Sequence, residues 1–293
     1  MVDPACHFSV VIPCFNEVDS ILKTVDGLLA DLAGEGVFEI IVVDDGSTDG
    51  SKEIVNSIVQ SYDNVLLVEH SVNRGYGAAL KSGIRRASSD LIAITDADGT
   101  YPNEKIGELV KLCEKYDMVV GARIGENVTY SKVRAIPKYF LRHWVSWIAG
   151  QNVPDINSGL RVFRKDIAES FFGVLSNKFS FTITITLSFL TTYRSVLYVP
   201  IGYKPRVGKS KIQPVRDTAR FIGLILRTGL YFAPIRALAP IIALMLCLAF
   251  GSLGYDVFYA QNLTDKTVLL FFFAFNTGMF ALLADMFDKR IGV

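Results

Sequence analysis

The amino-acid sequence predicts a three-layer α/β domain with a mostly parallel sheet, followed by two membrane-spanning helices. Over residues 8–121, short apolar runs alternate with segments in which apolar residues recur at helical spacing. Such alternation is typical of parallel strands covered by helices on both faces. Apolar residues make up 51% of the 293-residue chain, and their excess gathers after about residue 221. That concentration favours a tail in contact with a membrane.

Near-continuous apolar runs predict the strands, because strands buried on both faces carry few polar residues. The expected strands cover 8–13, 38–43, 65–69, 91–95 and 117–121. Amphipathic spacing predicts helices at 21–32, 51–60, 78–87, 104–115 and 131–150. Trp144 and Trp147 lie in the last of these helices, where either core packing or a membrane surface would explain them.

Overall charge and cysteine content indicate the compartment that the protein faces but not its partner. The formal net charge is +1, so whole-molecule charge identifies no partner. The four cysteines show no metal-ligand spacing and no disulfide-scaffold density, which indicates reduced thiols in a cytosol-facing protein. No apolar signal sequence precedes the first strand, so we expect the catalytic part on the cytoplasmic side. The three histidines have no carboxylate or nucleophile nearby in sequence and receive no role.

Acidic and amide side chains cluster at the ends of three predicted strands. Asp96 and Asp98 are two residues apart, so on an extended segment both point the same way. Two like charges this close favour a divalent cation, Mg²⁺ or Mn²⁺, as their partner. An isolated Asp-x-Asp is more often an ordinary turn, but the repetition favours a shared site at the edge where α/β sheets bind ligands. The three clusters are Asn16/Glu17, Asp44/Asp45 and Asp96/Asp98.

A glycine-containing turn at residues 73–77 precedes the helix predicted from residue 78. Gly75 and Gly77 would allow close approach of a ligand, and the helix N-terminus would favour an anion. The glycine spacing fits neither a phosphate-binding P-loop nor a dinucleotide fingerprint. As a ligand signal, this turn is weak.

Four stretches of the chain together resemble one family. They are residues 42–50 (VVDDGSTDG), 96–98 (DAD), 157–164 (NSGLRVFR) and 206–211 (RVGKSK). The chain resembles family-two glycosyltransferases with the GT-A fold, a Rossmann-like, mostly parallel sheet. Within them it is most similar to polyprenyl-phosphate glycosyltransferases of the dolichol-phosphate-mannose-synthase type. With the apolar tail, the resemblance covers essentially the whole chain.

The resemblance implies roles for matching positions on the donor side. Asp98, with Asp96, would hold Mg²⁺ or Mn²⁺ against the diphosphate of a nucleotide sugar. The segment at 206–211 would fold over that diphosphate. The residues implied to bind the nucleotide sugar are Pro13, Asn16, Glu17, Asp44, Asp45, Asp96, Ala97, Arg206, Lys209, Ser210 and Lys211.

On the acceptor side, Arg123 and Arg134 would bind the phosphate of the lipid, with Lys138 beside them where relatives often carry serine. We expect Asp98, Arg123 and Asp155 to be the catalytic residues. Asp155 either orients the acceptor or the metal, or caps a turn. Many relatives carry an acidic residue in the segment that matches 179–184, and this chain has none there.

The second half of the chain predicts the membrane attachment. Basic residues dominate from Lys204 to Arg236, which indicates an amphipathic helix on an anionic leaflet rather than a nucleic-acid site. Apolar stretches at about 237–259 and 267–287 are each close to the roughly 20 residues needed to cross a bilayer. Arg236 and Lys289-Arg290 would put both termini in the cytoplasm. We expect three parts: a glycosyltransferase domain at 1–213, a juxtamembrane helix at 214–234 and a transmembrane hairpin at 235–293.

The resemblance and the residues together predict inverting transfer of one sugar from a nucleotide sugar to membrane polyprenyl or dolichyl phosphate. UDP-glucose or UDP-N-acetylglucosamine is the favoured donor, with GDP-mannose next. The attacking phosphate is already ionised at pH 7, since its second pKa is about 6, so no strong base is required. One alternative is a processive polysaccharide synthase, although the chain lacks a Gln-x-x-Arg-Trp motif. Another is a non-catalytic, lipid-binding membrane scaffold. Relatives suggest a homotetramer.

Overall fold

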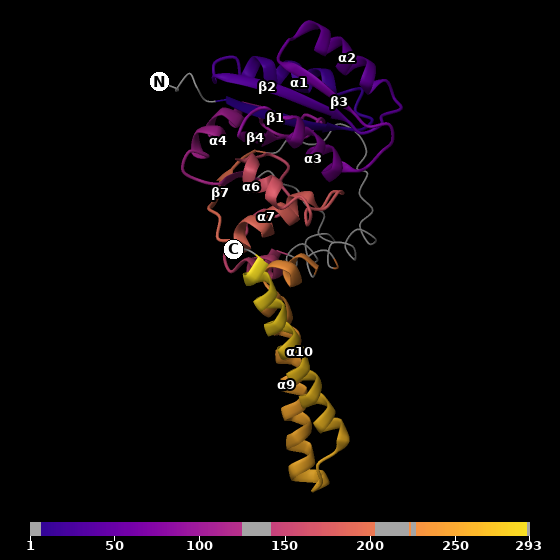
Figure 1. Ribbon diagram of the computed structural model, residues 1–293, viewed down its shortest axis with the longest axis vertical. Coiled ribbons are helices and arrows are strands. Elements are labelled where there is room, and N and C mark those ends of the chain that lie inside the picture. Colours follow the sequence, from indigo (N-terminus) through magenta and orange to yellow (C-terminus); the bar gives the residue numbers. More distant parts are fainter. Residues whose placement is uncertain (1–6, 125–141, 203–222, 224–226, 292–293) are drawn as a thin grey trace.

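A seven-stranded sheet forms the centre of the globular part (Figure 1). The computed structural model describes residues 7–124, 142–202, 223 and 227–291. The strand order is β3-β2-β1-β4-β6-β5-β7, and only β6 runs antiparallel to its neighbours. The predicted α/β fold with a mostly parallel sheet is therefore confirmed. The strands are β1 His7–Cys14, β2 Val37–Asp44, β3 Val65–Glu69, β4 Leu91–Ile94, β5 Met118–Ala122, β6 Arg161–Arg164 and β7 Val196–Pro200.

Helices cover both faces of the sheet, because successive side chains of each strand point to opposite faces. These helices are α1 Ile21–Asp31, α2 Ser51–Ser61, α3 Tyr76–Arg86, η1 Asn103–Lys105, α4 Ile106–Leu112, α6 Lys165–Ser170 and α7 Phe181–Thr191. On β1, Val10 and Ile12 pack with α1, α2 and α4, whereas Val11 packs with α3, α6 and α7. A further helix, residues 142–149, joins a third apolar cluster against α7.

Two predicted helices differ from the observed ones in their starts. The segment predicted as one helix from residue 104 begins as the 3₁₀ turn η1 before α4. Helix α3 begins at Tyr76, two residues earlier than predicted, directly after Gly75 with its positive φ of 103°. For the helix predicted at 131–150, residues 142–149 are helical, and 131–141 lie outside the described residues.

The sheet positions the site by bringing several strand ends to one edge. Strands β1, β2 and β4 pair in parallel, so Cys14, Asp44 and Thr95 mark the same edge. Because β6 runs antiparallel to both β4 and β5, these two strands also point the same way. The segment after Ala122 therefore leaves the sheet at that edge too.

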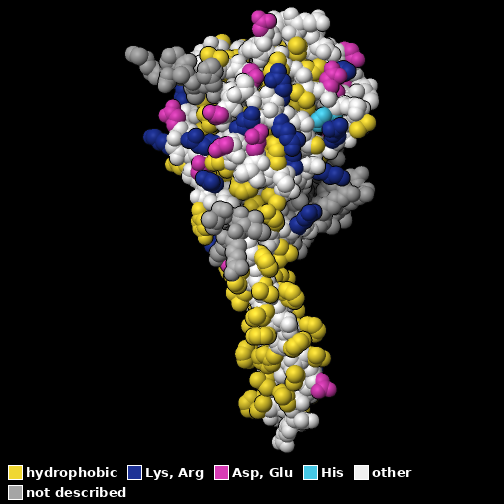
Figure 2. All heavy atoms as spheres, viewed as in Figure 1, with side chains coloured by type: hydrophobic (Ala, Val, Ile, Leu, Met, Phe, Trp, Pro, Cys, Tyr) yellow, Lys and Arg dark blue, Asp and Glu magenta, His cyan; other side chains and the backbone are white. Residues whose placement is uncertain are grey.

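The C-terminal part is a helical hairpin that extends away from the globular part (Figure 1). It consists of α9 Pro234–Tyr255, a π-helical turn Asp256–Ala260 and α10 Asp265–Ile291. Two segments, Pro234–Ala260 and Asp265–Phe287, are long and apolar enough to cross a membrane, at the predicted positions. Figure 2 shows hydrophobic side chains over most of this hairpin.

Polar contacts mark the two ends of the hairpin. At the tip, Asp256 Oδ2 accepts hydrogen bonds from the hydroxyls of Thr264, at 2.8 Å, and Thr267, at 2.6 Å. At the base, Trp147 Nε1 donates to the carbonyl oxygen of Arg236 at 2.9 Å. Trp144 packs against the third apolar cluster, whereas Trp147 is exposed, so the two tryptophans have different surroundings. Most of the predicted juxtamembrane helix lies outside the described residues, apart from a helical stretch at 227–232.

Candidate active site

A cavity of about 320 Å³ opens at the shared edge of the sheet. It is bounded by residues at the end of β1 and after β2 and β4, by the start of α3 and by one residue before α7. Six of its lining residues were predicted from the sequence: Pro13, Glu17, Asp45, Asp96, Ala97 and Asp98. The others are Cys14, Phe15, Asn73, Gly75, Tyr76, Ala79 and Phe179. Each of the three strand-end clusters therefore contributes at least one residue to this cavity.

Asp45 is buried and held by three donors. The backbone N–H of Arg74 donates to Oδ1 at 2.9 Å, and that of Gly75 donates to Oδ2 at 2.8 Å. His70 Nδ1 makes a hydrogen bond of 2.7 Å to Oδ1, and its Nε2 contacts Ser82 Oγ at 2.9 Å. No role was predicted for His70, because it lies 25 positions from Asp45 in the chain. That view was wrong: His70 fixes a carboxylate of the cavity wall.

Asp44 and Asn16, both predicted to bind the nucleotide sugar, do not line the cavity. Asn16 Oδ1 accepts the N–H of Thr48 at 2.8 Å, and the N–H of Asn16 donates to Ser47 Oγ at 2.9 Å. Asp44 Oδ2 accepts the N–H of Ser47 at 3.2 Å. Within the described residues, its buried Oδ1 has no hydrogen-bond partner. In this structure these two side chains accept hydrogen bonds from the turn after β2, at Ser47 and Thr48.

Asp96 and Asp98 both line the cavity, in agreement with their spacing on one extended segment. The hydroxyl of Tyr76 donates to Asp96 Oδ1 at 2.9 Å. Asp98 Oδ1 accepts the hydroxyl of Thr100 at 2.7 Å and its N–H at 3.2 Å. Each carboxylate is therefore oriented by at least one neighbouring donor.

The donor set fits a divalent cation of the kind predicted, provided that a substrate supplies further ligands. Among the described residues there is no group of three or more His, Cys, Asp or Glu side chains that could hold a metal alone. Mg²⁺ and Mn²⁺ prefer oxygen ligands, and Mg²⁺ is usually held by one or two carboxylates together with substrate phosphates. Asp96 and Asp98 supply that pair of carboxylates at the cavity.

The glycine turn before α3 makes room for the chain itself. A Cβ atom on Gly75 would lie 2.6 Å from the carbonyl oxygen of Asn177, and one on Gly77 would collide with the carbonyl oxygen of Ser176. The Asn177 carbonyl also accepts the N–H of Ala78 at 3.0 Å, at the N-terminus of α3. Lys81 Nζ binds the same segment through Asn177 Oδ1 at 2.7 Å. The space beside these glycines, which the sequence pattern suggested for a ligand, is thus occupied at Ser176 and Asn177 by the segment before α7.

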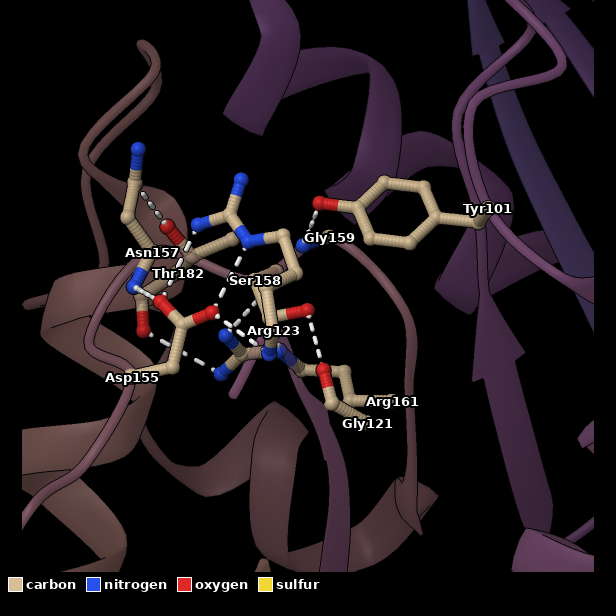
Figure 3. A network of polar contacts seen from close by, with 9 residues as sticks. All are labelled: Tyr101, Gly121, Arg123, Asp155, Asn157, Ser158, Gly159, Arg161 and Thr182. Atoms are coloured by element: carbon tan, nitrogen blue, oxygen red, sulfur yellow. Dashed lines mark hydrogen bonds and ion pairs between the residues drawn. The ribbon is translucent and has the colours of Figure 1, made fainter. Parts of the chain in front are cut away.

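Arg123, which follows β5, forms a bidentate ion pair with Asp155 (Figure 3). Arg123 Nε donates to Asp155 Oδ2 at 2.8 Å, and Nη2 donates to Oδ1 at 3.0 Å. The backbone N–H of Asn157 adds a bond of 3.1 Å to Oδ1. Burial acts to raise the pKa of Asp155, but the hydrogen bond and charge of Arg123 outweigh it and lower that pKa to about 2. The sequence proposed both residues as catalytic without pairing them.

A buried arginine fixes the segment that carries Asp155. Arg161 is fully buried, and its guanidinium donates to the carbonyl oxygens of Ser158 and Thr182 (Figure 3). It also donates to the hydroxyl of Thr186 at 3.0 Å. Asn157 Oδ1 in turn accepts the hydroxyl of Thr182 at 2.7 Å. The motif at 157–164 served only as evidence of family resemblance in the sequence analysis. The structure shows that its Arg161 connects β6 to α7 through hydrogen bonds.

The remaining predicted site residues lie outside the described residues. These are Arg134 and Lys138 on the acceptor side, and Arg206, Lys209, Ser210 and Lys211 on the segment expected to cover the diphosphate. Their roles stay predictions.

The comparison with protein families agrees with this fold and cavity. Residues 9–172, more than half of the chain, match the family model described as glycosyl transferase family 2. The chain therefore belongs to that family and is a glycosyltransferase of the GT-A fold.

Curated relatives include named enzymes. The low-salt glycan biosynthesis hexosyltransferase Agl6 of Haloferax volcanii is 28% identical over 88% of this chain and 63% of its own length. An undecaprenyl-phosphate 4-deoxy-4-formamido-L-arabinose transferase of Yersinia pestis is 31% identical over 61% of this chain and 58% of its own length. This chain thus spans less than two-thirds of each of these two relatives.

Solved structures share the fold at low sequence identity. Glucosyl-3-phosphoglycerate synthase from Mycobacterium tuberculosis, in complex with UDP, has a TM-score of 0.58 at 18% identity, over 76% of this chain and 80% of that one. The mannosyltransferase PcManGT from Pyrobaculum calidifontis, in complex with GDP-Man and Mn²⁺, has a TM-score of 0.52 at 18% identity, over 99% of this chain and 89% of that one.

Proposed function

We propose that the protein transfers one sugar from a nucleotide-diphosphate sugar to polyprenyl or dolichyl phosphate, with inversion at the anomeric carbon. The observation that carries this proposal is that Asp45, Asp96 and Asp98 line the same cavity. Two apolar helices at the C-terminus support a lipid acceptor, because such an acceptor stays in the bilayer. The Yersinia relative, whose name includes undecaprenyl phosphate, supports the same acceptor class.

On the donor side, Asp45 would lie beside the base and ribose, and Asp96 and Asp98 beside the diphosphate. These two carboxylates would hold Mg²⁺ or Mn²⁺, which when bound neutralises the negative charge that gathers on the nucleoside diphosphate as it leaves. Thr100 and Tyr76 keep their carboxylates oriented before the donor arrives. Arg206, Lys209 and Lys211 would add positive charge over the diphosphate.

On the acceptor side, Arg123, Arg134 and Lys138 would hold the phosphate of the lipid. One oxygen of that phosphate attacks the anomeric carbon, and the bond from this carbon to the diphosphate breaks. Because the phosphate is ionised at pH 7, with a second pKa of about 6, the step needs no strong base. Positioning two anions within reach of each other is then the main task of the protein, which suits arginine side chains. In-line attack gives inversion, so an α-linked donor yields a β-linked product.

The membrane attachment follows from the same proposal. Residues 1–213 would form the cytoplasmic catalytic domain, and the basic helix at 214–234 would lie on the anionic leaflet. The hairpin would cross the bilayer with both of its ends in the cytoplasm. A homotetramer is the assembly we expect, and nucleic acid is not a partner.

A donor panel tests the proposal directly. The full chain, purified in detergent with lipid, is incubated with a short polyprenyl phosphate, Mg²⁺ or Mn²⁺ and labelled nucleotide sugars. We expect one sugar per lipid, with UDP-glucose or UDP-N-acetylglucosamine as the donor and GDP-mannose as the next candidate. Transfer should stop when the metal is chelated or the acceptor is omitted. A growing polymer would favour a processive synthase instead, and absence of transfer from every donor would contradict the proposal.

A further inference from the structure

Tyr76, the first residue of α3, contacts a carboxylate of the donor cavity. Its hydroxyl donates to Asp96 Oδ1 at 2.9 Å. Its ring stacks on Phe179, with the centroids 5.6 Å apart and the planes inclined by 12°. All three side chains line the same cavity, although Tyr76 is 20 positions from Asp96 in the chain.

Asp96 is also confined by the backbone at Gly159. A Cβ atom at this position would lie 3.0 Å from both carboxylate oxygens of Asp96, which is closer than ordinary packing allows. Gly159 is itself fixed, because its N–H donates to the hydroxyl of Tyr101 at 2.7 Å (Figure 3). The carboxylate is thus bounded by the Tyr76 hydroxyl and, on another side, by the backbone of Gly159, while it also lines the cavity.

The Tyr76 hydroxyl is the donor in its contact with Asp96, because an ionised carboxylate only accepts hydrogen bonds. A phenol that keeps its proton can only orient an adjacent carboxylate oxygen by donating to it. Outer groups of this kind determine how a metal-ligating or phosphate-facing carboxylate is aimed.

We propose that Tyr76 is a positioning residue for Asp96, with Phe179 holding the tyrosine ring in place. The hydroxyl fixes the Asp96 carboxylate in the orientation that receives the cation and the diphosphate of the donor. This rests on the proposed function, in which Asp96 takes part in binding the metal and the nucleotide.

Tyr76→Phe tests the hydroxyl while it keeps the ring and its stacking on Phe179. Binding of Mn²⁺ to the full chain with UDP or GDP present is measured by electron paramagnetic resonance, as free against bound ion. We expect Mn²⁺ affinity to fall about ten- to hundredfold, the usual loss for an outer-shell partner. Tyr193→Phe removes a hydroxyl from a residue that is 91% exposed and should leave the affinity within twofold.

A double-mutant cycle separates positioning from general loss of structure. In the Asp96→Asn background, Tyr76→Phe should cause no further loss of Mn²⁺ affinity, because the carboxylate that the hydroxyl aims is gone. A loss of the same size in both backgrounds would overturn the proposal, as would Mn²⁺ affinity within twofold of wild type for Tyr76→Phe alone. If wild-type protein bound neither nucleotide with any metal, the proposed function would fail as well.

Discussion

Two groups of charged residues lie at the same edge of the sheet: the acidic rim after β4 and the basic rim after β5. They differ in the contacts that their side chains make. After β4, Asp96 and Asp98 face a cavity and are each oriented by a neighbouring hydroxyl. After β5, the guanidinium of Arg123 is bound along its Nε–Nη2 edge by Asp155. The carboxylates of the acidic rim are therefore oriented before any ligand binds. The basic rim has neutralised part of its own charge.

The proposed donor and the proposed lipid phosphate would meet these two rims differently. A donor with its metal would meet carboxylates that need no rearrangement. A lipid phosphate would have to contact Arg123 along the other edge of its guanidinium, or displace Asp155. The Arg123 side chain is only 14% exposed, so either route is narrow. We therefore expect variants at the acidic rim to impair every donor, and variants at the basic rim to act through the acceptor.

Asp98→Asn should have the largest effect. It removes a charge from the predicted metal site, and we expect turnover with every donor to fall at least about a thousandfold. The measurement is transfer to polyprenyl phosphate at saturating donor and metal. Asp90→Asn is the matched control, because Asp90 is exposed just before the opposite end of β4. Substantial residual turnover in Asp98→Asn would remove Asp98 from the metal site.

Arg123→Ala should have a smaller effect, confined to the acceptor. Loss of a charge-assisted bond to phosphate costs about 2–3 kcal/mol, so kcat/KM for the lipid should fall about thirty- to hundredfold. The affinity for a nucleoside diphosphate should not change. Asp155→Asn, which leaves the guanidinium less firmly oriented, should cost about tenfold in the same quantity. Arg194→Ala, at an exposed arginine, serves as control. Unchanged dependence on acceptor concentration in Arg123→Ala would refute the assignment.

The ion pair of the basic rim also predicts how stability depends on acid. Its carboxyl has a folded-state pKa of about 2, below the ordinary value of 3.8. The stabilisation is therefore complete above about pH 4 and is lost as the pH falls through about 2. It amounts to about 2 kcal/mol. Thermal unfolding in detergent between pH 5 and pH 2 should show a steeper decline for wild type than for Asp155→Asn. Parallel declines would contradict the pairing.

The smallest predicted effect is thiol modification at Cys14. This residue lines the cavity, but its thiol should not react in the native protein. Burial, and then the charges of Asp44 and Glu17, raise the pKa of its thiol to about 12. Only the thiolate reacts readily with maleimides. At pH 8 we expect negligible modification of Cys14 in the native protein, and full modification after denaturation, by peptide mass spectrometry. Rapid labelling of native Cys14 would show that this wall of the cavity opens.

Local patterns sufficed for most of the fold and for part of the site. Apolar runs and helical spacing marked strands β1 to β5 and helices α1 to α4, but not β6, β7, α6 or α7. The two-residue spacing of Asp96 and Asp98 put both at one cavity. The hydrogen-bonded pairs that the sequence analysis did not predict join residues that are distant in the chain and are brought together by the fold. Tyr76 reaches Asp96 across 20 positions, and His70 reaches Asp45 across 25.

At the turn before α3, the sequence pattern predicted a ligand contact where the structure shows a contact within the chain. Its glycines were read as space for a ligand. The carbonyls of Ser176 and Asn177 occupy the positions that Cβ atoms would take, although Gly75 also lines the cavity. A glycine indicates that something approaches the backbone closely. It does not indicate whether the approaching group belongs to a ligand or to a distant part of the same chain.

The most direct test of the acidic rim is calorimetric titration of the full chain with UDP and with GDP, with and without Mn²⁺. We predict that wild-type protein binds at least one of these nucleotides only when Mn²⁺ is present, and that Asp98→Asn removes this dependence together with the binding. Equal, metal-independent binding by wild type and Asp98→Asn would contradict the account.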